Sequence, residues 1–363
     1  MHKDRFMTAL RGEQPDMVPL WDLGINETSI INIARHFTDD LPPDKLVHEM
    51  TPDELIKIVN TLMLVTDELD FDGVTVPAFL GRESVGSGTI KDKLGVVLQP
   101  SPHGEPVVLD GPIKSREDLA SYKAPVPDAS WFLAVQMAKN HLQGGKAIVF
   151  QLSGTFKFSW ALRGGMQHLC MDYIEDPQFA HALARVVTDM LIAGFEGAMD
   201  AGADAVVLDG DLAMNNTTLM SPAHYREFIK PYHKEIVDAV HAKGGLVVKH
   251  SDGNLWPIID DLIEIGVDGI HPIQPQCMDI AEVNKAVGDR VCLLGNIDCQ
   301  RLLCEATPEQ VADVVKQTIR AAAPGGGYIL CTSNTIHPDV KPGNAIAMYR
   351  AGRDYGRYPI SVE

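Results

Sequence analysis

The residues best suited to chemistry lie in the segment 249–254, which reads Lys-His-Ser-Asp-Gly-Asn. This segment follows the apolar run 245–248 and precedes an amphipathic run from 255 to 265, a pattern that predicts a strand, a polar turn and a helix. His250 and Asp252 are two residues apart, so at strand period their side chains point the same way. In repeated strand–helix units, ligands bind at the carboxyl ends of the strands. His250 and Asp252 are therefore the first candidates for catalysis.

Polar side chains also follow the other expected strands, and they would share one mouth if those strands formed a barrel. Ordinary structural roles compete with function at these positions. Asp209 and Asp211 flank a glycine, which is typical of a turn, and Asp252 could simply be the N-cap of the next helix. The strand-end set is Asp22, Ser153, Asp209, Asp211, His250, Asp252, His271, Gln274, Asn296, Asp298, Asn334 and His337.

Three kinds of site are compatible with these residues. His250 could hold a divalent metal together with Asp211, Asp252 or His337, because imidazole and carboxylate groups suit Zn²⁺ and similar ions. His250, Asp211 and Asp252 could instead form an acid–base set. The third possibility is a polar binding pocket without chemistry, and the spacing does not choose among the three.

The chain alternates apolar strand patterns with helical periodicity, which predicts an α/β fold. We expect one (β/α)8 TIM barrel over residues 1–363, with an N-terminal helical extension and a β-hairpin insertion at 94–109. The rival is a doubly wound sheet, but no G-x-G-x-x-G sequence follows a strand. The expected strands are 17–21, 73–76, 147–152, 205–208, 246–250, 269–273, 291–294 and 327–330, and the expected helices are 53–70, 180–200, 225–243, 256–266, 280–287, 307–322 and 344–355.

Composition excludes several classes of partner. Lys plus Arg number 31 against 49 Asp plus Glu, which gives a net charge of −18 with no basic tract. A nucleic-acid partner is therefore not expected, and a polyanionic substrate is disfavoured. No apolar run is long enough to span a membrane, and the N-terminus lacks the apolar core of a signal peptide. The six cysteines form no C-x-x-C pair, so we expect free thiols in a cytoplasmic protein.

Four segments resemble the uroporphyrinogen decarboxylase superfamily, namely 11–19, 221–228, 250–254 and 295–298. The resemblance extends over almost the whole chain and implies the (β/α)8 barrel that the periodicity also predicts. Decarboxylases of this superfamily carry an arginine-rich N-terminal segment that binds carboxylates, whereas the corresponding stretch here, 21–26, has no arginine. The C-terminal histidine of the decarboxylases falls near Asn334.

The second branch of the superfamily contains corrinoid-dependent methyltransferases. Members that methylate coenzyme M hold zinc with His-x-Cys and a distant cysteine. This chain has His250-x-Asp252, and Asn334 lies near the distant position with Cys331 three residues earlier. The resemblance thus favours the relatives that demethylate methyl ethers, aromatic ones in particular.

The function implied by this resemblance is transfer of a methyl group from a methylated small molecule, expected to be an aromatic methyl ether, to the Co(I) corrinoid of a partner protein. The alternatives are a porphyrinogen decarboxylase-like lyase and a binding protein on the same fold. The expected catalytic residues are His250, Asp252 and Asp211, and the expected ligands of a zinc ion are His250, Asp252 and His337. Phe79 and Trp160 could complete an aromatic pocket, or pack in the core, beside the expected substrate-binding residues Trp21, Phe156, Asp209, His271, Gln274, Asn296 and Asn334.

Overall fold

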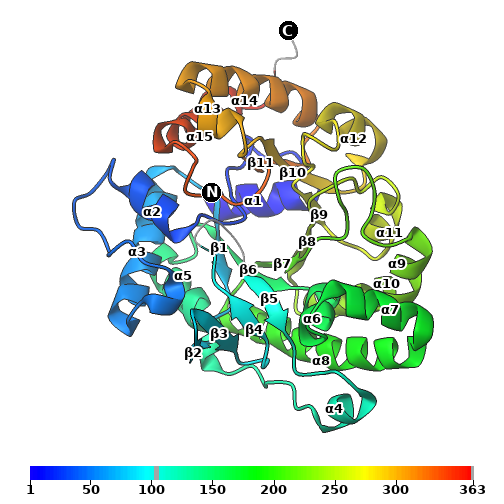
Figure 1. Cartoon of the computed structure of the whole chain (residues 1–363). Coiled ribbons are helices and arrows are strands. Elements are labelled where there is room, and N and C mark those ends of the chain that lie inside the picture. The colour runs from blue at the N-terminus through cyan, green and yellow to red at the C-terminus, as the bar shows by residue number, and fades with distance from the viewer. Residues whose placement is uncertain (102–105, 361–363) are drawn as a thin grey trace.

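The computed structural model describes residues 1–101 and 106–360. Seven parallel strands form a curled sheet in the order β1-β6-β7-β8-β9-β10-β11, and helices cover its outer face (Figure 1). This arrangement confirms the α/β barrel class. The strands are β1 (Gly73–Pro77), β6 (Ala147–Ser153), β7 (Ala205–Asp209), β8 (Leu246–His250), β9 (Gly269–His271), β10 (Cys292–Ile297) and β11 (Tyr328–Thr332).

The described part of the chain contains the α-helices α1 (His2–Leu10), α2 (Glu27–Ala34), α3 (Pro52–Glu68), α4 (Arg116–Ser121), α5 (Leu133–Leu142), α6 (Thr155–Leu162), α7 (Met166–Glu175), α8 (Pro177–Ala201), α9 (Pro222–Phe228), α10 (Lys230–Ala242), α11 (Ile259–Glu264), α12 (Ile280–Val287), α13 (Leu302–Glu305), α14 (Pro308–Ala322) and α15 (Pro342–Tyr355), together with the 3₁₀ turns η1 (Val47–Glu49) and η2 (Ala129–Phe132). None of these helices is both long and apolar enough to cross a membrane. All six cysteines are free, as expected.

The expected eighth strand at 17–21 forms only isolated bridges, a parallel one between Leu20 and Leu330 of β11 and an antiparallel one between Met17 and Arg357. Pro19 has no N–H to give to a ladder, and the N–H of Leu20 donates to the Asp72 carboxylate at 2.8 Å. The segment nevertheless joins the two edge strands. The N–H of Trp21 donates to the carbonyl of Leu330 at 3.2 Å, while the hydroxyl of Thr75 in β1 donates to the carbonyl of Asp22 at 2.7 Å. Residues 19–22 therefore close the barrel in place of a full strand.

Side chains alternate between the inside and the outside of the barrel, as strand period requires. Val149, Val207 and Val248 point inward and pack with the buried face of α1, which lies across the amino ends of the strands. Their neighbours, such as Phe150 and Leu208, belong to the larger outer core. The expected N-terminal helical extension is thus a plug for one end of the barrel.

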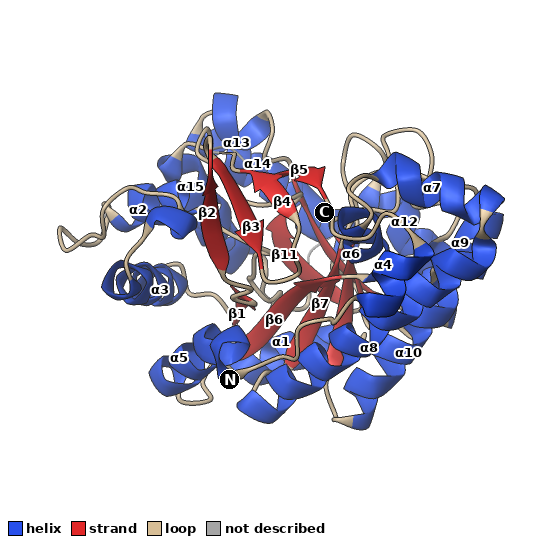
Figure 2. Ribbon diagram, turned by 60° about the horizontal axis from the view of Figure 1, so that its bottom comes forward, coloured by secondary structure: helices blue, strands red, loops and turns tan. Residues whose placement is uncertain are grey.

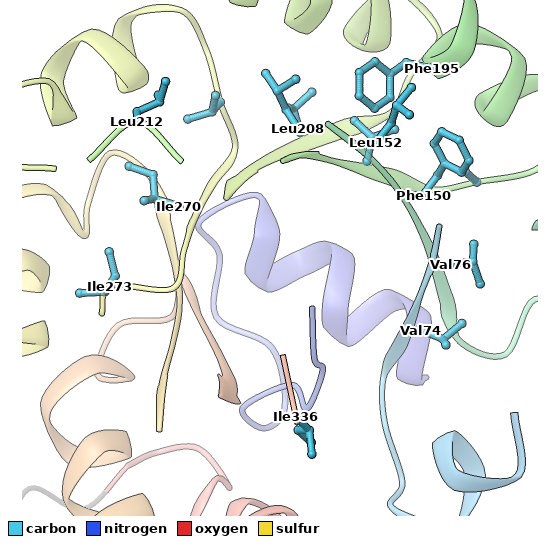
Figure 3. Packing of buried hydrophobic residues seen from close by; sticks show 14 of the residues in the cluster. Val74, Val76, Phe150, Leu152, Phe195, Leu208, Leu212, Ile270, Ile273 and Ile336 are labelled. Atoms are coloured by element: carbon cyan, nitrogen blue, oxygen red, sulfur yellow. The ribbon is translucent and has the colours of Figure 1, made fainter. Parts of the chain in front are cut away.

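The outer layer is packed against the covering helices. Figure 3 shows Phe150 and Leu152 of β6 beside Phe195 of α8, and the rings of Phe150 and Phe195 meet edge to face with centroids 6.2 Å apart. The outward side chains of the strands thus form the core with the helices. The inward side chains at the carboxyl ends of the strands are not needed for this packing and can form a site.

The hairpin expected at 94–109 is part of a larger antiparallel sheet. Strands β2 (Arg82–Gly86), β3 (Thr89–Asp92), β4 (Val97–Gln99) and β5 (Val107–Asp110) pair in that order and stand apart from the parallel strands (Figure 2). The expected turn at 103–105 lies outside the described residues. The β4–β5 pairing confirms the hairpin, and β2 and β3 enlarge it.

Two expected helices differ in extent from the sequence prediction. The helix expected at 225–243 is divided at Ile229 into α9 and α10, because Pro231 lacks the N–H that an unbroken helix would use there. The helix expected at 256–266 begins only at Ile259, after Pro257. Its N-cap is Ile258, so Asp252 does not cap this helix.

A buried carboxylate ties the plug helix to the barrel closure. Asp72 is fully buried and accepts hydrogen bonds from Arg5 of α1 at 2.7 Å and Arg353 of α15 at 2.9 Å, besides the N–H of Leu20. Burial alone would raise the pKa of Asp72, but a hydrogen bond with His2 at 2.8 Å, the charges of Arg353 and Arg5 and the N–H of Leu20 lower it. Asp72 is therefore an ionised anchor between the two cations.

We predict that Asp72→Asn lowers the free energy of unfolding by about 3–5 kcal/mol, because it leaves two guanidinium groups without their buried counterion. Urea denaturation followed by circular dichroism measures the change. The matched control is Asp70→Asn, since Asp70 also pairs with Arg353 but is half-exposed, and it should cost at most about 1 kcal/mol. Equal effects of the two variants would contradict the anchoring role of Asp72.

Candidate active site

A cavity of about 660 Å³ opens at the carboxyl ends of the parallel strands. Its polar wall comes from the strand ends and includes Asp209, Asp211, His250 and Asn334. Its apolar wall comes from α2, α3 and β1 and comprises Ile30, Leu55, Ile58, Val59, Leu62, Val74 and Val76. The charged lining residues are Asp22, Glu27, Asp209, Asp211, Arg82 and Lys157, so acids outnumber bases.

The inward row of each strand supplies the floor of this cavity. Thr75, Gln151, Asp209 and His250 continue the inward alternation at the ends of β1, β6, β7 and β8, and all four line the cavity. His271 occupies the same row on β9 but is fully buried behind His250. Strand period therefore brings residues from distant parts of the sequence into one layer.

The loop after β8 is held tightly against the loop after β7. Gly253 has a φ of +93°, and a Cβ there would lie 2.7 Å from the backbone of residues 213 and 214. The N–H of Asp252 donates to Asp211 at 2.9 Å. As a result, His250, Asp211 and Asp252 each offer one ligand atom within 4.8 Å of the others.

The hydrogen bonds of two neighbouring histidines, His250 and His271, fix their tautomers. His271 Nε2 is 3.3 Å from the carbonyl of Thr332, which can only accept, so this nitrogen carries the proton. Burial lowers the pKa of His271, so the ring is neutral and its Nδ1 is an acceptor. His250 Nδ1, 2.8 Å away, must then donate. His250 Nε2 is therefore left to face Asp209 at 3.7 Å and Asp211 at 3.8 Å.

Asp252 is a carboxyl group with one occupied and one free oxygen. Asn334 donates to its Oδ2 at 2.6 Å, whereas Oδ1 is buried without a hydrogen-bond partner among the described residues. Burial raises the pKa of Asp252 to about 6, and the neighbouring charge of Asp211 acts in the same direction. This group can therefore hold a proton or accept a cation at Oδ1.

A buried lysine supports the acidic strand ends. Lys249 is fully buried, and its ammonium group donates to the carbonyls of Leu208 at 3.2 Å, Gly210 at 2.7 Å and His250 at 2.5 Å. Burial lowers the pKa of Lys249 to about 8. Burial alone would raise the pKa of Asp209, but the charges of His250 and Lys249 lower it. Lys249 thus fixes the backbone that carries Asp209, Asp211 and His250.

Several expected substrate contacts have other positions. Trp21 is fully buried and packs edge to face on His271, with centroids 5.5 Å apart, and Phe156 is buried in the outer core. Neither residue lines the cavity. The sequence pattern could not show this, because it does not reveal which way a side chain points in an irregular closing segment or at the start of a helix. Phe79 does line the cavity, but Trp160 does not.

Two expected polar contacts serve the backbone. Gln274 accepts from the N–H of Gly253 at 2.8 Å, and Asn296 donates to the carbonyl of Ile273 at 2.9 Å. His337 lines the cavity, but its Nε2 is 3.0 Å from the carbonyl of Cys299, and it is not part of the cluster formed by His250. The residue that lies close to both His250 and Asp252 is therefore Asp211 and not the expected ligand His337.

Two buried ionisable residues of the site, Asp22 and Lys249, were not among the expected catalytic, metal-binding or substrate-binding residues, although Asp22 belongs to the strand-end set. Asp22 lines the cavity, and its position after an apolar run was a usable signal. Lys249 gave a second signal, because a lysine inside an apolar strand must find polar partners when the strand is buried.

Comparisons with known proteins agree with the barrel. The family described as Uroporphyrinogen decarboxylase (URO-D) matches residues 84–355. Proteins named uroporphyrinogen decarboxylase from Pseudoalteromonas atlantica and Chlorobium phaeovibrioides are 26% and 28% identical, and the alignments cover 98% and 95% of this chain and 97% and 95% of those proteins. A methyltransferase structure from Methanosarcina mazei has a TM-score of 0.77 at 19% identity, with 98% of both chains covered, which is a likeness of fold.

We predict that Lys249→Met lowers the free energy of unfolding by about 3 kcal/mol, because three buried carbonyl groups lose their donor. Chemical denaturation measures this loss. Lys243→Met is the control, since Lys243 pairs with Asp200 at the surface, and we expect no measurable change there. A Lys249→Met protein as stable as wild type would show that the carbonyls do not depend on the ammonium group.

Proposed function

The chain belongs to the uroporphyrinogen decarboxylase (URO-D) family of enzymes, and from this premise we propose that it is a methyltransferase that moves a methyl group from a methylated small molecule to the Co(I) corrinoid of a partner protein. The observation that carries the proposal is the cluster of His250, Asp211 and Asp252, of which His250 and Asp211 line a cavity that also has an apolar wall. The reduced corrinoid would supply the nucleophile, so this chain needs to bind the methyl donor and activate its leaving group.

The shape and lining of the cavity support a donor with an apolar body. Its volume of about 660 Å³ lies within the range of small-molecule pockets. The apolar wall formed by α2, α3 and β1 is aliphatic, and Phe71 and Phe79 add aromatic side chains to the lining of the cavity. An aromatic methyl ether could therefore place its ring against this wall and its ether oxygen toward His250 and Asp252.

Departure of an alkoxide or phenolate is difficult, so the ether oxygen needs a proton or a Lewis acid. Asp252 suits the first role, because its pKa of about 6 keeps part of the population protonated near neutral pH. With Asn334 bound to Oδ2, the proton would reside on Oδ1, which has no other partner among the described residues. Asp252 would then donate this proton to the leaving oxygen.

The same atoms fit a zinc ion. Within the described residues Asp252 Oδ1 has no hydrogen-bond partner, and His250 Nε2 is 3.7 Å from Asp209 and 3.8 Å from Asp211, beyond hydrogen-bond distance. Asp211 lies beside both atoms. His271 would orient His250 through the hydrogen bond to Nδ1, as partners of metal-bound histidines commonly do. When bound, the ion would supply Lewis acidity to the donor oxygen. Asp252 would in that case serve as an ionised ligand and not as the acid.

Decarboxylation of a porphyrinogen is the second candidate, and the names of the relatives favour it. The charge of the cavity argues against this reaction. Arg82 is the one arginine among the described lining residues, whereas Glu27, Asp209 and Asp211 add negative charge. Such a pocket would repel a substrate with many carboxylates.

We predict that wild-type protein methylates chemically reduced cobalamin from a methoxylated aromatic donor, seen as the spectral change of the methylated product. His250→Ala and Asp252→Asn should lower the rate by about 100- to 10,000-fold, the usual contribution of an acid–base group. Asp298→Asn is the matched control, because Asp298 also follows a strand but does not line the cavity, and an asparagine oxygen can still accept from the N–H of Gln300. This variant should retain activity. Porphyrinogen turnover without any corrinoid would decide for the lyase.

We predict that zinc binds the protein in calorimetric titrations and that His250→Ala weakens this binding at least about 10-fold, because a ligand is lost. His337→Ala should leave the affinity for zinc unchanged, since the Nε2 of His337 is hydrogen-bonded to the carbonyl of Cys299. Loss of zinc affinity in His337→Ala would contradict the ligand set proposed here. Absence of zinc binding by active wild-type protein would leave Asp252 as a general acid.

A further inference from the structure

Asp22 is a buried carboxyl group in the segment that closes the barrel, and it lines the cavity. Its oxygens contact the hydroxyl of Thr332 at 2.6 Å, the N–H of Thr332 at 3.3 Å, the N–H of Leu23 at 3.1 Å and the phenol of Tyr349. Within the described parts of the chain it forms no ion pair. An ionised carboxylate would thus be buried without a cation.

The hydroxyl of Thr332 lies between two oxygen atoms and has one hydrogen to give. One neighbour is Asp22 Oδ1, and the other is the backbone carbonyl of Asn334. The carbonyl can only accept, so the hydroxyl must donate to it if that contact is a hydrogen bond. The contact with Asp22 then needs a hydrogen from Asp22 itself. Both contacts are satisfied only when Asp22 is a carboxylic acid.

We propose that Asp22 is protonated in the resting protein and acts as a positioning residue, donating to Thr332 so that Thr332 holds Asn334 for its contact with Asp252. The chain of contacts runs from Asp22 Oδ1 through the Thr332 hydroxyl to Asn334, whose amide donates to Asp252 at 2.6 Å. The consequence for Asp252 rests on the proposed function. The location of the proton on Asp22 does not.

The surroundings of Asp22 agree with a neutral acid. Burial raises the pKa of Asp22 to about 7, although the hydrogen bonds from Thr332 and Tyr349 act in the opposite direction. The titratable groups that face it are Tyr349 of α15, Cys331 of β11 and Cys299 after β10, and the pKa of each is itself raised by burial. These neighbours are uncharged near neutral pH, so they supply no positive charge to hold a carboxylate.

Loss of the proton would rearrange the contacts. The single hydrogen of Thr332 would turn toward the charged Asp22, and the carbonyl of Asn334 would lose its donor. The position of Asn334, and with it the hydrogen bond to Asp252, would then depend on pH. Asp72 offers a matched contrast, because it is equally buried but held ionised by Arg5 and Arg353.

The test compares the pH dependence of unfolding in wild type and Asp22→Asn. A folded-state pKa above the unfolded value stabilises the protein below the unfolded pKa, and this contribution is lost as the pH rises through the folded pKa. The unfolding constant of wild type relative to Asp22→Asn should therefore increase about tenfold per pH unit between pH 5 and 7. In Asp22→Asn the amide nitrogen takes the place of Oδ1 and cannot accept from the N–H of Leu23. The variant therefore loses some stability by an amount that does not depend on pH.

Asp72→Asn should show the opposite sign, since the pKa of Asp72 is lowered and its contribution is lost as the pH falls. A wild-type to Asp22→Asn ratio that is flat, or that falls with rising pH, would overturn the proposal. Carbon NMR of labelled aspartate carboxyl groups gives a second measurement on wild type alone. The signal of Asp22 is the resonance that is absent from Asp22→Asn. If Asp22→Asn fails to fold, it is the resonance most displaced in Thr332→Val. We expect this resonance to have the chemical shift of a protonated carboxylic acid at pH 6.

A carboxylate signal at pH 6 would overturn the proposal in the same way. Neither measurement uses a substrate, so each outcome is independent of whether methyl transfer occurs. If Asp22 is protonated, Asp22→Asn should also retain more methyl transfer than Asp22→Ala, because the amide still donates to Thr332. Equal loss of activity in both variants, with the proton confirmed, would reject only the link from Asp22 to Asp252.

Discussion

The geometry of the strand ends depends on one buried cation. Lys249 lies on the outward row of β8, yet its ammonium group reaches the carbonyls of Leu208, Gly210 and His250 and uses all three of its hydrogens. These carbonyls belong to the backbone that carries the two aspartates after β7 and the histidine at the end of β8. A buried charge is costly unless it is fully hydrogen-bonded, so this backbone has little freedom to move. The acidic cluster is therefore held in place from behind.

The closing segment of the barrel uses two buried carboxyl groups in different ways. Asp72 lies between Arg5 and Arg353 and binds the N–H of Leu20, which replaces part of a missing strand ladder. Asp22, two residues after Leu20, contacts hydroxyl and amide groups and pairs with no cation in the described part of the chain. Burial favours the neutral form of an acid unless a positive charge compensates. The same physical effect thus produces an ionised anchor at one point and a protonated acid at another.

Family membership alone leaves the reaction open, since the named relatives are decarboxylases and the similar structure is a methyltransferase. The proposal therefore rests on the contents of the cavity. An aliphatic wall and an acidic floor suit an apolar donor better than a polycarboxylate. His250 lines the cavity, and Asp252 beside it has a buried oxygen without a hydrogen-bond partner among the described residues. The cavity also differs from the expected aromatic pocket, because Trp21 and Phe156 pack in the core and do not line it.

The sequence by itself determined the order of the seven strands of the parallel sheet, most of their ends, and the longest helices, among them α8 and α14, because these follow from local periodicity. It also brought His250, Asp252 and Asp211 together as candidates, since strand ends in a barrel share one mouth. Only the tertiary structure decided that Asp211 and not His337 joins His250, that Trp21 faces the core, and that segment 19–22 closes the barrel without a strand. These outcomes depend on partners far away in the chain, such as His271 for His250 and Asp72 for Leu20, and local pattern contains no information about them.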